Sequence, residues 1–297
     1  MIKNIFGGGL AFFSFLVVTS LLSVTYSAES TVESSDSSSV GESVTTSGIT
    51  TPVHVALLKR MDGEHPLTAP VRWAKAGVIQ MENEIQDYSA ILVKRERIHG
   101  VLGKEEHMFI KVRHEPFSVY MKFLKPRRYR GREAIYVAGR NDGNILAHGT
   151  GFEAVLGTLS LHPTSPQAMN GNLHPITELG ILNLARRLAK EAEQQLHRNS
   201  FEVSYSHCKL NGVECVRLEV LNNERFQEDP FYKAHIYVDI HRNIPIRYVA
   251  WGWETEENGE PPLLEEYTYL DVQLNQNFQD VDFDIANPEY HYRKSRD

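Results

Sequence analysis

The chain has 297 residues, 38 acidic and 31 basic side chains, and a formal net charge of −7. Proteins that bind nucleic acid present a basic surface to the phosphates, so this charge balance argues against a nucleic-acid partner. The length is sufficient for one large domain or two small ones.

Residues 1–28 have the pattern of a secretory signal peptide. Lys3 precedes the apolar run LAFFSFLVVTSLLSV, and the small residues Ser27 and Ala28 follow it. A basic start, an apolar middle and a small-residue end are typical of such a signal, which predicts an exported protein of the periplasm or cell envelope. Cleavage after Ala28 would leave the bulky Tyr26 near the cleavage site. An uncleaved anchor is therefore the alternative, because about 20 apolar residues can span a bilayer and would bring the protein into membrane contact.

Residues 29–66 are predicted to form a disordered, mildly acidic linker. The first part of this segment is mostly Ser and Thr, and no Lys or Arg occurs between Lys3 and Lys59. Such a segment buries too little apolar surface to offset the entropy lost on ordering. Residues 67–292 then remain for one β-rich domain, followed by a short tail at 293–297.

Two helices are predicted within this domain. The first covers residues 70–86, where apolar residues recur at three- and four-residue spacing and Pro70 suits the first turn. The second covers residues 176–198 and has the clearest apolar stripe in the chain. The stripes consist of Val71, Ala74, Val78, Met81 and Ile85 in the first helix, and of Ile176, Leu179, Leu182, Leu184, Ala185, Leu188, Ala192 and Leu196 in the second.

About ten strands are predicted, in two meanders separated by the second helix. Alternating apolar positions give each strand one bulky apolar face, and short turns favour antiparallel pairing. The sequence therefore predicts an α+β fold, a strongly curved antiparallel β half-barrel closed by helices. Residues 149–175 contain no strong strand, and a long excursion of this kind is often a lid. The strands are expected at residues 88–99, 105–114, 117–124, 134–138, 144–148, 201–210, 213–221, 233–240, 244–253 and 264–274.

The only two cysteines flank a predicted hairpin turn. Asn211-Gly212 is a strong two-residue turn signal, and it places Cys208 directly opposite Cys215. Directly opposed residues lie within disulfide reach, and exported proteins meet oxidising conditions. We predict a Cys208–Cys215 disulfide, with a reduced pair as the alternative.

Motifs for catalysis are lacking. None of the 13 histidines has HExxH spacing, and no P-loop or GxSxG occurs. We assign no catalytic residue, no metal and no cofactor. The acidic clusters at 254–257, 265–266 and 280–284 leave a hydrolase with a carboxylate site as the least favoured alternative.

The block KPRRYRGR stands out against the acidic background. Its arginines are Arg127, Arg128, Arg130 and Arg132. Charge runs are usually solvated faces or turns. The functional interpretation is a basic rim for phosphate head groups or an acidic partner, because guanidinium groups pair well with such oxygens.

Four segments resemble a family of exported proteins of unknown function known as DUF1571. They are DYSAILVKRERIHGVLGKEEHMFIKVRHEPFSVYMKFLKP, GREAIYVAGRNDGNILAHG, and the closing LLEEYTYLDVQLN with DVDFDIANPEY. The resemblance covers about residues 81–292 and implies no known activity. More loosely, the opening helix, the early meander, the KPRRYRG turn and DIHRNIPIRYVAW resemble the LolA/LolB lipoprotein-carrier half-barrel. That resemblance implies a fold and no binding residues.

The concave side of such a sheet would hold either a ligand or the protein's own core. Met and Phe suit a pliable apolar pocket and a filled core equally well. We expect a lipid or lipoprotein acyl chain as the ligand; the alternative is a filled envelope module that binds another protein or a glycan. The candidate cavity residues are Ile91, Val93, Met108, Ile110, Val112, Phe117, Val119, Met121, Phe123, Ile236, Val238 and Tyr248.

Overall fold

A computed structural model describes residues 55–226, 231–253 and 259–292. These residues belong to the second of two compact units, Ile49–Asp297. The predicted signal peptide, most of the linker and the tail lie outside the described residues. Of the predicted linker, Val55–Leu58 forms a short 3-10 helix, η1, whose Leu58 is buried against Trp73. The packed part of the chain therefore begins before the predicted boundary at residue 66.

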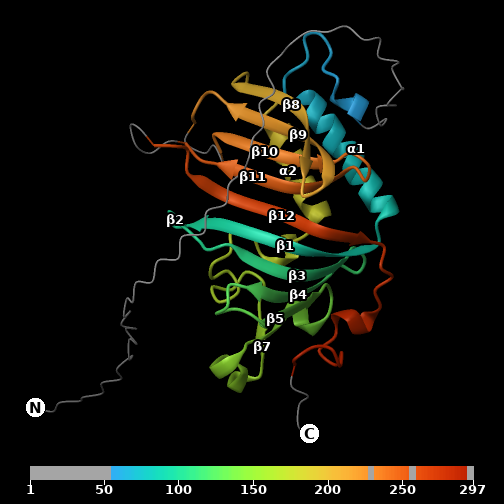
Figure 1. Cartoon of the computed structure of the whole chain (residues 1–297), viewed down its shortest axis with the longest axis vertical. Helices are drawn as coiled ribbons and strands as arrows, with labels where there is room; N and C mark the ends of the chain where they lie inside the picture. The colour runs from blue at the N-terminus through green and yellow to red at the C-terminus, as the bar shows by residue number, and fades with distance from the viewer. Residues whose placement is uncertain (1–54, 227–230, 254–258, 293–297) are drawn as a thin grey trace, which may run out of the picture. The chain divides into compact units, whose positions relative to one another are not determined.

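The unit is built on one twelve-stranded antiparallel sheet, in the order β7-β6-β5-β4-β3-β1-β12-β11-β10-β9-β8, with β2 paired to β1 (Figure 1). The sheet is not closed, since β7 and β8 are its edges. β1 and β12 pair at its centre, with Tyr88 opposite Leu274. The strands are β1 Asp87–Ile98, β2 Val101–Leu102, β3 Glu106–Arg113, β4 Ser118–Lys125, β5 Glu133–Val137, β6 Ile145–His148, β7 Thr158–Leu161, β8 Phe201–Leu210, β9 Val213–Asn222, β10 Lys233–Asp239, β11 Ile244–Trp251 and β12 Leu263–Leu274.

The sequence prediction of about ten strands was too low by two. The ten predicted strands all form, and the additional ones are β2 and β7. β7 lies in the excursion for which no strong strand was predicted, between Gly157 and His162. It has four residues and pairs only with β6. Its extended conformation therefore depends on this pairing, which the strand propensity of its own residues does not predict.

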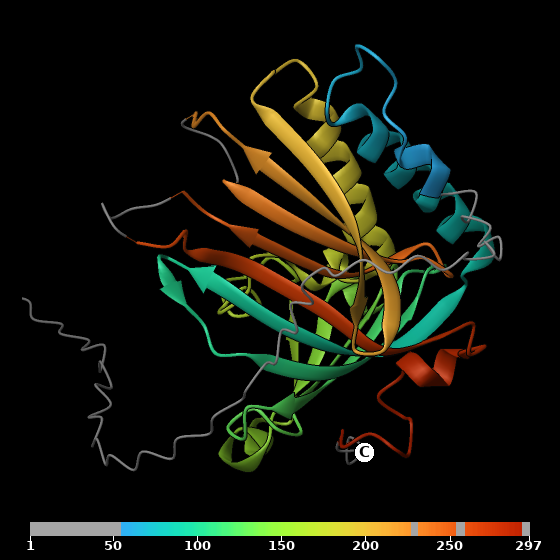
Figure 2. The same ribbon diagram turned by 45° about the horizontal axis from the view of Figure 1, so that its top comes forward.

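Two α-helices pack on the concave face of the sheet (Figure 2). They are α1, Thr68–Glu84, and α2, Ile181–Gln194. α2 begins later than predicted, because Gly180 has a φ of +116° and separates it from the 3-10 turn η4, Ile176–Glu178. A Cβ on Gly180 would also lie only 3.0 Å from the Tyr88 hydroxyl, which accepts a hydrogen bond from the Ile181 amide.

The C-terminal segment packs on the opposite, convex face. After β12, the Asp87 carboxylate accepts hydrogen bonds from the backbone amides of residues 276, 277 and 278, which turns the chain back over the sheet. The 3-10 helix η5, Asp280–Phe283, follows. The Tyr290 ring then stacks on Tyr120 of β4 with 3.9 Å between the ring centroids. The sheet is thus covered on both sides in this region.

The hairpin of β8 and β9 has the predicted register. Cys208 is directly opposite Cys215, on either side of the Asn211-Gly212 turn. Both cysteines are free thiols in this structure, so the disulfide stays a prediction.

Candidate ligand-binding site

An apolar cavity of about 810 Å³ lies between the two helices and the strands β8–β11. This volume falls within the ~300–1,000 Å³ range of small-molecule sites in proteins. We call this region, β8–β11 with the facing sides of α1 and α2, the cavity half of the concave face. Apolar side chains make up most of its lining: Val71, Ala74 and Met81 from α1, Ala185, Leu188, Ala189 and Ala192 from α2, and Leu218, Val220, Ala234, Ile236, Val238 and Tyr248 from the sheet.

Small side chains on the helices leave this space open. Ala185, Ala189 and Ala192 lie on the apolar stripe of α2, and Gly77 is on the facing side of α1. Because alanine and glycine have small side chains or none, they occupy little of the space between the helices and the sheet. Longer side chains at these positions would close the cavity, because protein interiors otherwise pack to crystal density.

Polar groups line the cavity at the turn between β10 and β11, where Asn243 lies, and around the C-terminal end of α2, where the lining includes Glu191, Gln194, Gln195, His197 and Arg198. Asn243, at the turn between β10 and β11, accepts a hydrogen bond from the Trp73 indole and donates one to Gln80, at 2.8 Å each. Beyond the C-terminal end of α2, the Arg198 guanidinium lies 4.2 Å from the centroid of the Phe226 ring. Both groups line the cavity, so an apolar ligand would meet a few polar contacts along its length.

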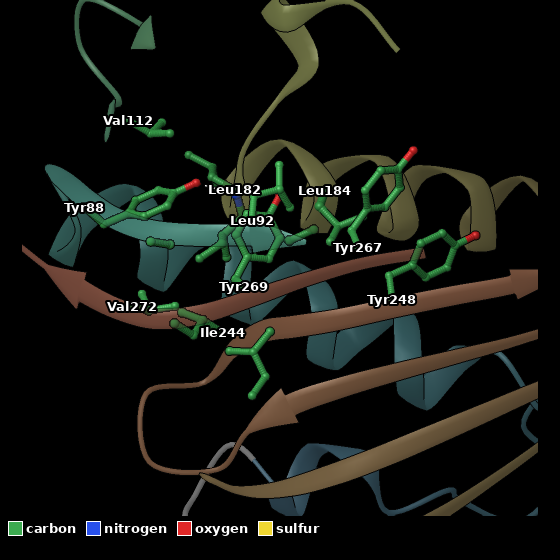
Figure 3. Close-up of a cluster of buried hydrophobic side chains, with 14 of the residues drawn as sticks. Tyr88, Leu92, Val112, Leu182, Leu184, Ile244, Tyr248, Tyr267, Tyr269 and Val272 are labelled. Atoms are coloured by element: carbon green, nitrogen blue, oxygen red, sulfur yellow. Dashed lines mark hydrogen bonds between the residues drawn. The ribbon is translucent and has the colours of Figure 1, made fainter. Parts of the chain in front are cut away.

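The rest of the concave face, on β1, β3, β4 and β12, is filled, and we call it the packed half. Tyr88, Leu92, Tyr267 and Tyr269 point from β1 and β12 toward α2 and its leucines (Figure 3). Met108, Ile110 and Val112 of β3 belong to the same buried cluster. Side chains from the sheet and from α2 therefore occupy the space that a ligand would need.

A buried network of charged groups completes the packed half. The Lys94 ammonium lies 3.0 Å from Glu96 and 3.5 Å from Glu106, and the Tyr267 hydroxyl donates a hydrogen bond to Glu96. On the adjacent strand, the Glu265 carboxylate lies 3.2 Å from the Arg187 guanidinium. Because each of these charges has a partner, burial does not leave an isolated ion in the protein interior.

The network also holds the excursion before α2 on the sheet. His174 contacts the Glu265 carboxylate at 3.0 Å, and the Leu173 amide donates to Glu96 at 3.1 Å. The pKa of Glu265 responds to two opposed effects. Burial would raise it, but the hydrogen bond with His174 and the charge of Arg187 lower it to about 2. Nearby, burial raises the pKa of Glu191, which lines the cavity.

Ten of the twelve predicted cavity residues lie on the concave face and divide between its two halves. Ile236, Val238 and Tyr248 line the cavity. Val119 is buried on β4, in register with Val112. The others on β3 and β4, or next to them, are core residues of the packed half or pack against it: Met108, Ile110, Val112, Phe117, Met121 and Phe123.

The prediction for Ile91 and Val93 of β1 was wrong. Leu92 is opposite Met108 and shares the concave face, so Ile91 and Val93 face the convex side. The run Ala90–Val93 is apolar at four successive positions, so it does not alternate between apolar and polar residues. The sequence therefore does not show which of these side chains face the concave side. Polar residues such as Lys94 and Glu96 are expected on the solvent side, which would put Ile91 and Val93 on the concave side. Instead, Lys94 and Glu96 are buried on the concave side, because they form ion pairs there.

Sequence reasoning missed the helical part of the cavity. It named strand residues only, whereas alanines of α2 form one wall. The available signal was that the stripe of α2 changes from leucine to alanine toward its C-terminal end.

The predicted basic rim does not border the cavity. Arg127, Arg128 and Arg130 are exposed and Arg132 is half-buried, all in the loop between β4 and β5. Three strands, β3, β1 and β12, separate β4 from the strands of the cavity half.

The described residues contain neither a cluster of metal ligands nor a helix suited to cross a membrane. No three His, Cys, Asp or Glu side chains in this part of the chain come together as a set of metal ligands. None of its helices combines the length and apolar character needed to cross a bilayer.

The sequence matches the family described as "Protein of unknown function (DUF1571)" over residues 85–292. The chain belongs to this family. No curated protein matches the sequence.

Solved structures with similar folds include three bacterial proteins. An uncharacterized conserved protein from Thermus thermophilus has 12% identity and a TM-score of 0.40, covering 72% of this chain and 92% of its own. The lipoprotein LppX from Mycobacterium tuberculosis has 10% identity and a TM-score of 0.39, covering 70% and 98%. A LolA superfamily protein from Nitrosomonas europaea has 11% identity and a TM-score of 0.28, covering 71% and 97%. Similarities this weak do not support an inference about function.

Proposed function

We propose that this protein is a non-enzymatic binding protein of the cell envelope that holds a lipid or lipoprotein acyl chain in the cavity half. The observation that supports it is the apolar cavity of about 810 Å³ beneath α1 and α2. An acyl chain needs an apolar space with few polar groups, and the cavity along the alanine-lined wall of α2 provides one. The signal-peptide pattern of residues 1–28 supports the envelope location.

The two alternatives are less well supported. A filled interaction module would bury apolar side chains throughout the concave face, and the cavity half departs from that. A carboxylate hydrolase would need a group that gains and loses a proton near neutral pH. The hydrogen bond with His174 and the charge of Arg187 hold the pKa of Glu265 well below its usual range despite burial, so this carboxyl is not that group.

Native mass spectrometry after gentle extraction tests the proposal directly. We expect a lipid adduct on the purified protein, released by organic solvent. A second measurement uses a fluorescent polyene fatty acid as the probe, titrated into the delipidated protein. A saturable increase in its emission is expected. A clean protein mass together with no saturable probe binding would reject the proposal.

A cavity-filling variant identifies the site. Ala189→Phe places a ring in the cavity and would displace at least two methylene groups of a bound chain. At about 0.8 kcal/mol per methylene, binding of the probe should weaken about tenfold. The matched control is Ala147→Phe on β6, outside the cavity lining. Equal weakening by both variants would show that the probe binds elsewhere.

A further inference from the structure

Two loops at the β7 end of the sheet form one continuous surface. The first is residues 126–132, between β4 and β5, and the second is residues 149–157, between β6 and β7, which includes the 3-10 helix η3, Gly151–Leu156. The Thr150 hydroxyl donates a hydrogen bond to the Arg130 carbonyl at 3.4 Å. A Cβ on Gly131 would lie 3.1 Å from the Thr150 methyl group, so the two loops are in close contact.

The second loop and the start of β7 expose large apolar side chains. Val155 is 75% exposed, Leu156 67% and Leu159, at the start of β7, 39%. η3 lies at the β7 edge of the sheet, below the β7 label in Figure 1. Clustered exposed apolar residues usually mark a surface that is covered in function.

The first loop supplies positive charge next to these apolar side chains. Lys125, Arg127, Arg128 and Arg130 are exposed, in a chain whose net charge is −7. The guanidinium groups of Arg128 and Arg132 both lie 4.3 Å from the centroid of the Tyr129 ring, which orders this part of the loop. Within the described part of the chain, the ion pairs do not involve Arg127, Arg128 or Arg130. Their charge is therefore available for an external anion.

We propose that this surface, residues 125–132 with 149–159, docks the protein on an anionic phospholipid bilayer. The side chains of Val155 and Leu156 enter the interface between head groups and acyl chains, and Arg127, Arg128 and Arg130 pair with lipid phosphates. Exposed apolar side chains next to basic ones suit a bilayer, which adapts around inserted residues. An acidic protein partner would use the charge but would leave the exposed apolar side chains without a matching contact. The proposal does not depend on the ligand cavity, which lies in the other half of the sheet.

The test places a fluorescent reporter among these apolar side chains in the full chain. Leu156→Trp should shift its emission to shorter wavelength when vesicles of phosphatidylglycerol and phosphatidylcholine are added, and the shift should disappear in high salt. Vesicles of phosphatidylcholine alone should leave the spectrum unchanged. The control is Ile79→Trp, an equally exposed apolar position on α1 away from both loops. The control matters because the apolar residues 10–24 could also bring the full chain to vesicles.

Removing the arginines measures their contribution. At about fivefold per basic residue near an anionic surface, the Leu156→Trp protein with R127Q, R128Q and R130Q should need about 100-fold more anionic lipid for half of the shift. An unchanged spectrum with anionic vesicles, a shift equal to that of Ile79→Trp, or a titration unaffected by the three substitutions would each overturn the proposal. A response to polyglutamate without a response to vesicles would overturn it in favour of an acidic protein partner.

Discussion

The two halves of the concave face are built from the same sheet and the same two helices, yet only one leaves space. In the packed half, tyrosines from β1 and β12 reach the leucines at the start of α2. In the cavity half, alanines of α2 face β9 and β10 across the cavity. The difference shows that a curved sheet does not by itself create a binding site. The size of the side chains on the covering helix decides whether the concave face is core or cavity.

Charge distinguishes the halves as well. The packed half contains the ion pairs of Lys94 with Glu96 and of Arg187 with Glu265. These pairs fix the excursion before α2 on the sheet through residues 173 and 174. The packed half therefore anchors the segment that leads into α2, one of the two helices that cover the cavity.

The largest expected effect comes from breaking the Arg187–Glu265 pair. Arg187→Ala leaves the Glu265 carboxylate buried without its guanidinium partner, which typically costs about 3–5 kcal/mol of folding free energy. The matched control is the neighbouring Arg186→Ala, which removes an exposed pair with Glu82 and should cost less than about 1 kcal/mol. Urea denaturation measures both. Similar losses in the two variants would contradict the structural role given to this network.

The second prediction concerns the pH dependence of stability. Burial raises the pKa of Glu265, but His174 and Arg187 outweigh that effect and lower the pKa from an ordinary 4.5 to about 2. A lowered folded-state pKa gives stability that is present above pH 4.5 and lost as the pH falls toward 2. That loss is about 3 kcal/mol, at about 1.4 kcal/mol per pKa unit.

Glu265→Gln isolates this contribution from the other carboxylates. The stability difference between the native protein and the variant should shrink by that amount between pH 6 and pH 2, as measured by urea denaturation at each pH. A difference that stays constant over this range would show that the pKa of Glu265 is not lowered.

The smallest effect compares one substitution in the two halves. Ala90→Leu adds volume to the packed half, where Ala90 is opposite Ile110, and should cost about 1–3 kcal/mol through overpacking. Ala189→Leu adds the same volume next to the cavity and should change the stability of the ligand-free protein by less than about 1 kcal/mol. Thermal denaturation of the delipidated proteins gives both values. Equal costs would indicate that the cavity half is also tightly packed in solution.

Much of the fold could be predicted because its local signals agree. The Asn211-Gly212 turn and the alternation on both sides of it specify one register, and the structure has that register. The alternation in β3 and β4 likewise gives the concave face correctly. β1 fails because apolar residues occupy both faces at positions 90–93, and the buried Lys94 and Glu96 reverse the expected polarity. Only the tertiary ion pairs explain that reversal.

The site was less predictable than the sheet. A cavity is a volume that side chains leave unfilled, and no single residue type reports it. Ile236 and Val238 look the same in sequence as Ile110 and Val112, although one pair lines the cavity and the other lies in the core. What differs is the helix surface opposite them, and helix–sheet pairing is not visible in the sequence alone.

The pairing of β1 with β12 has a consequence for how this chain is made. The two strands at the middle of the sheet come from opposite ends of the domain, since Tyr88 is opposite Leu274. A chain that emerges N-terminus first, from a ribosome or through a translocation pore, cannot assemble the centre of its sheet until Leu274 is out. Long-range pairing of this kind forms late. The topology thus delays completion of the sheet until β12 has emerged, because only β12 joins the two meanders.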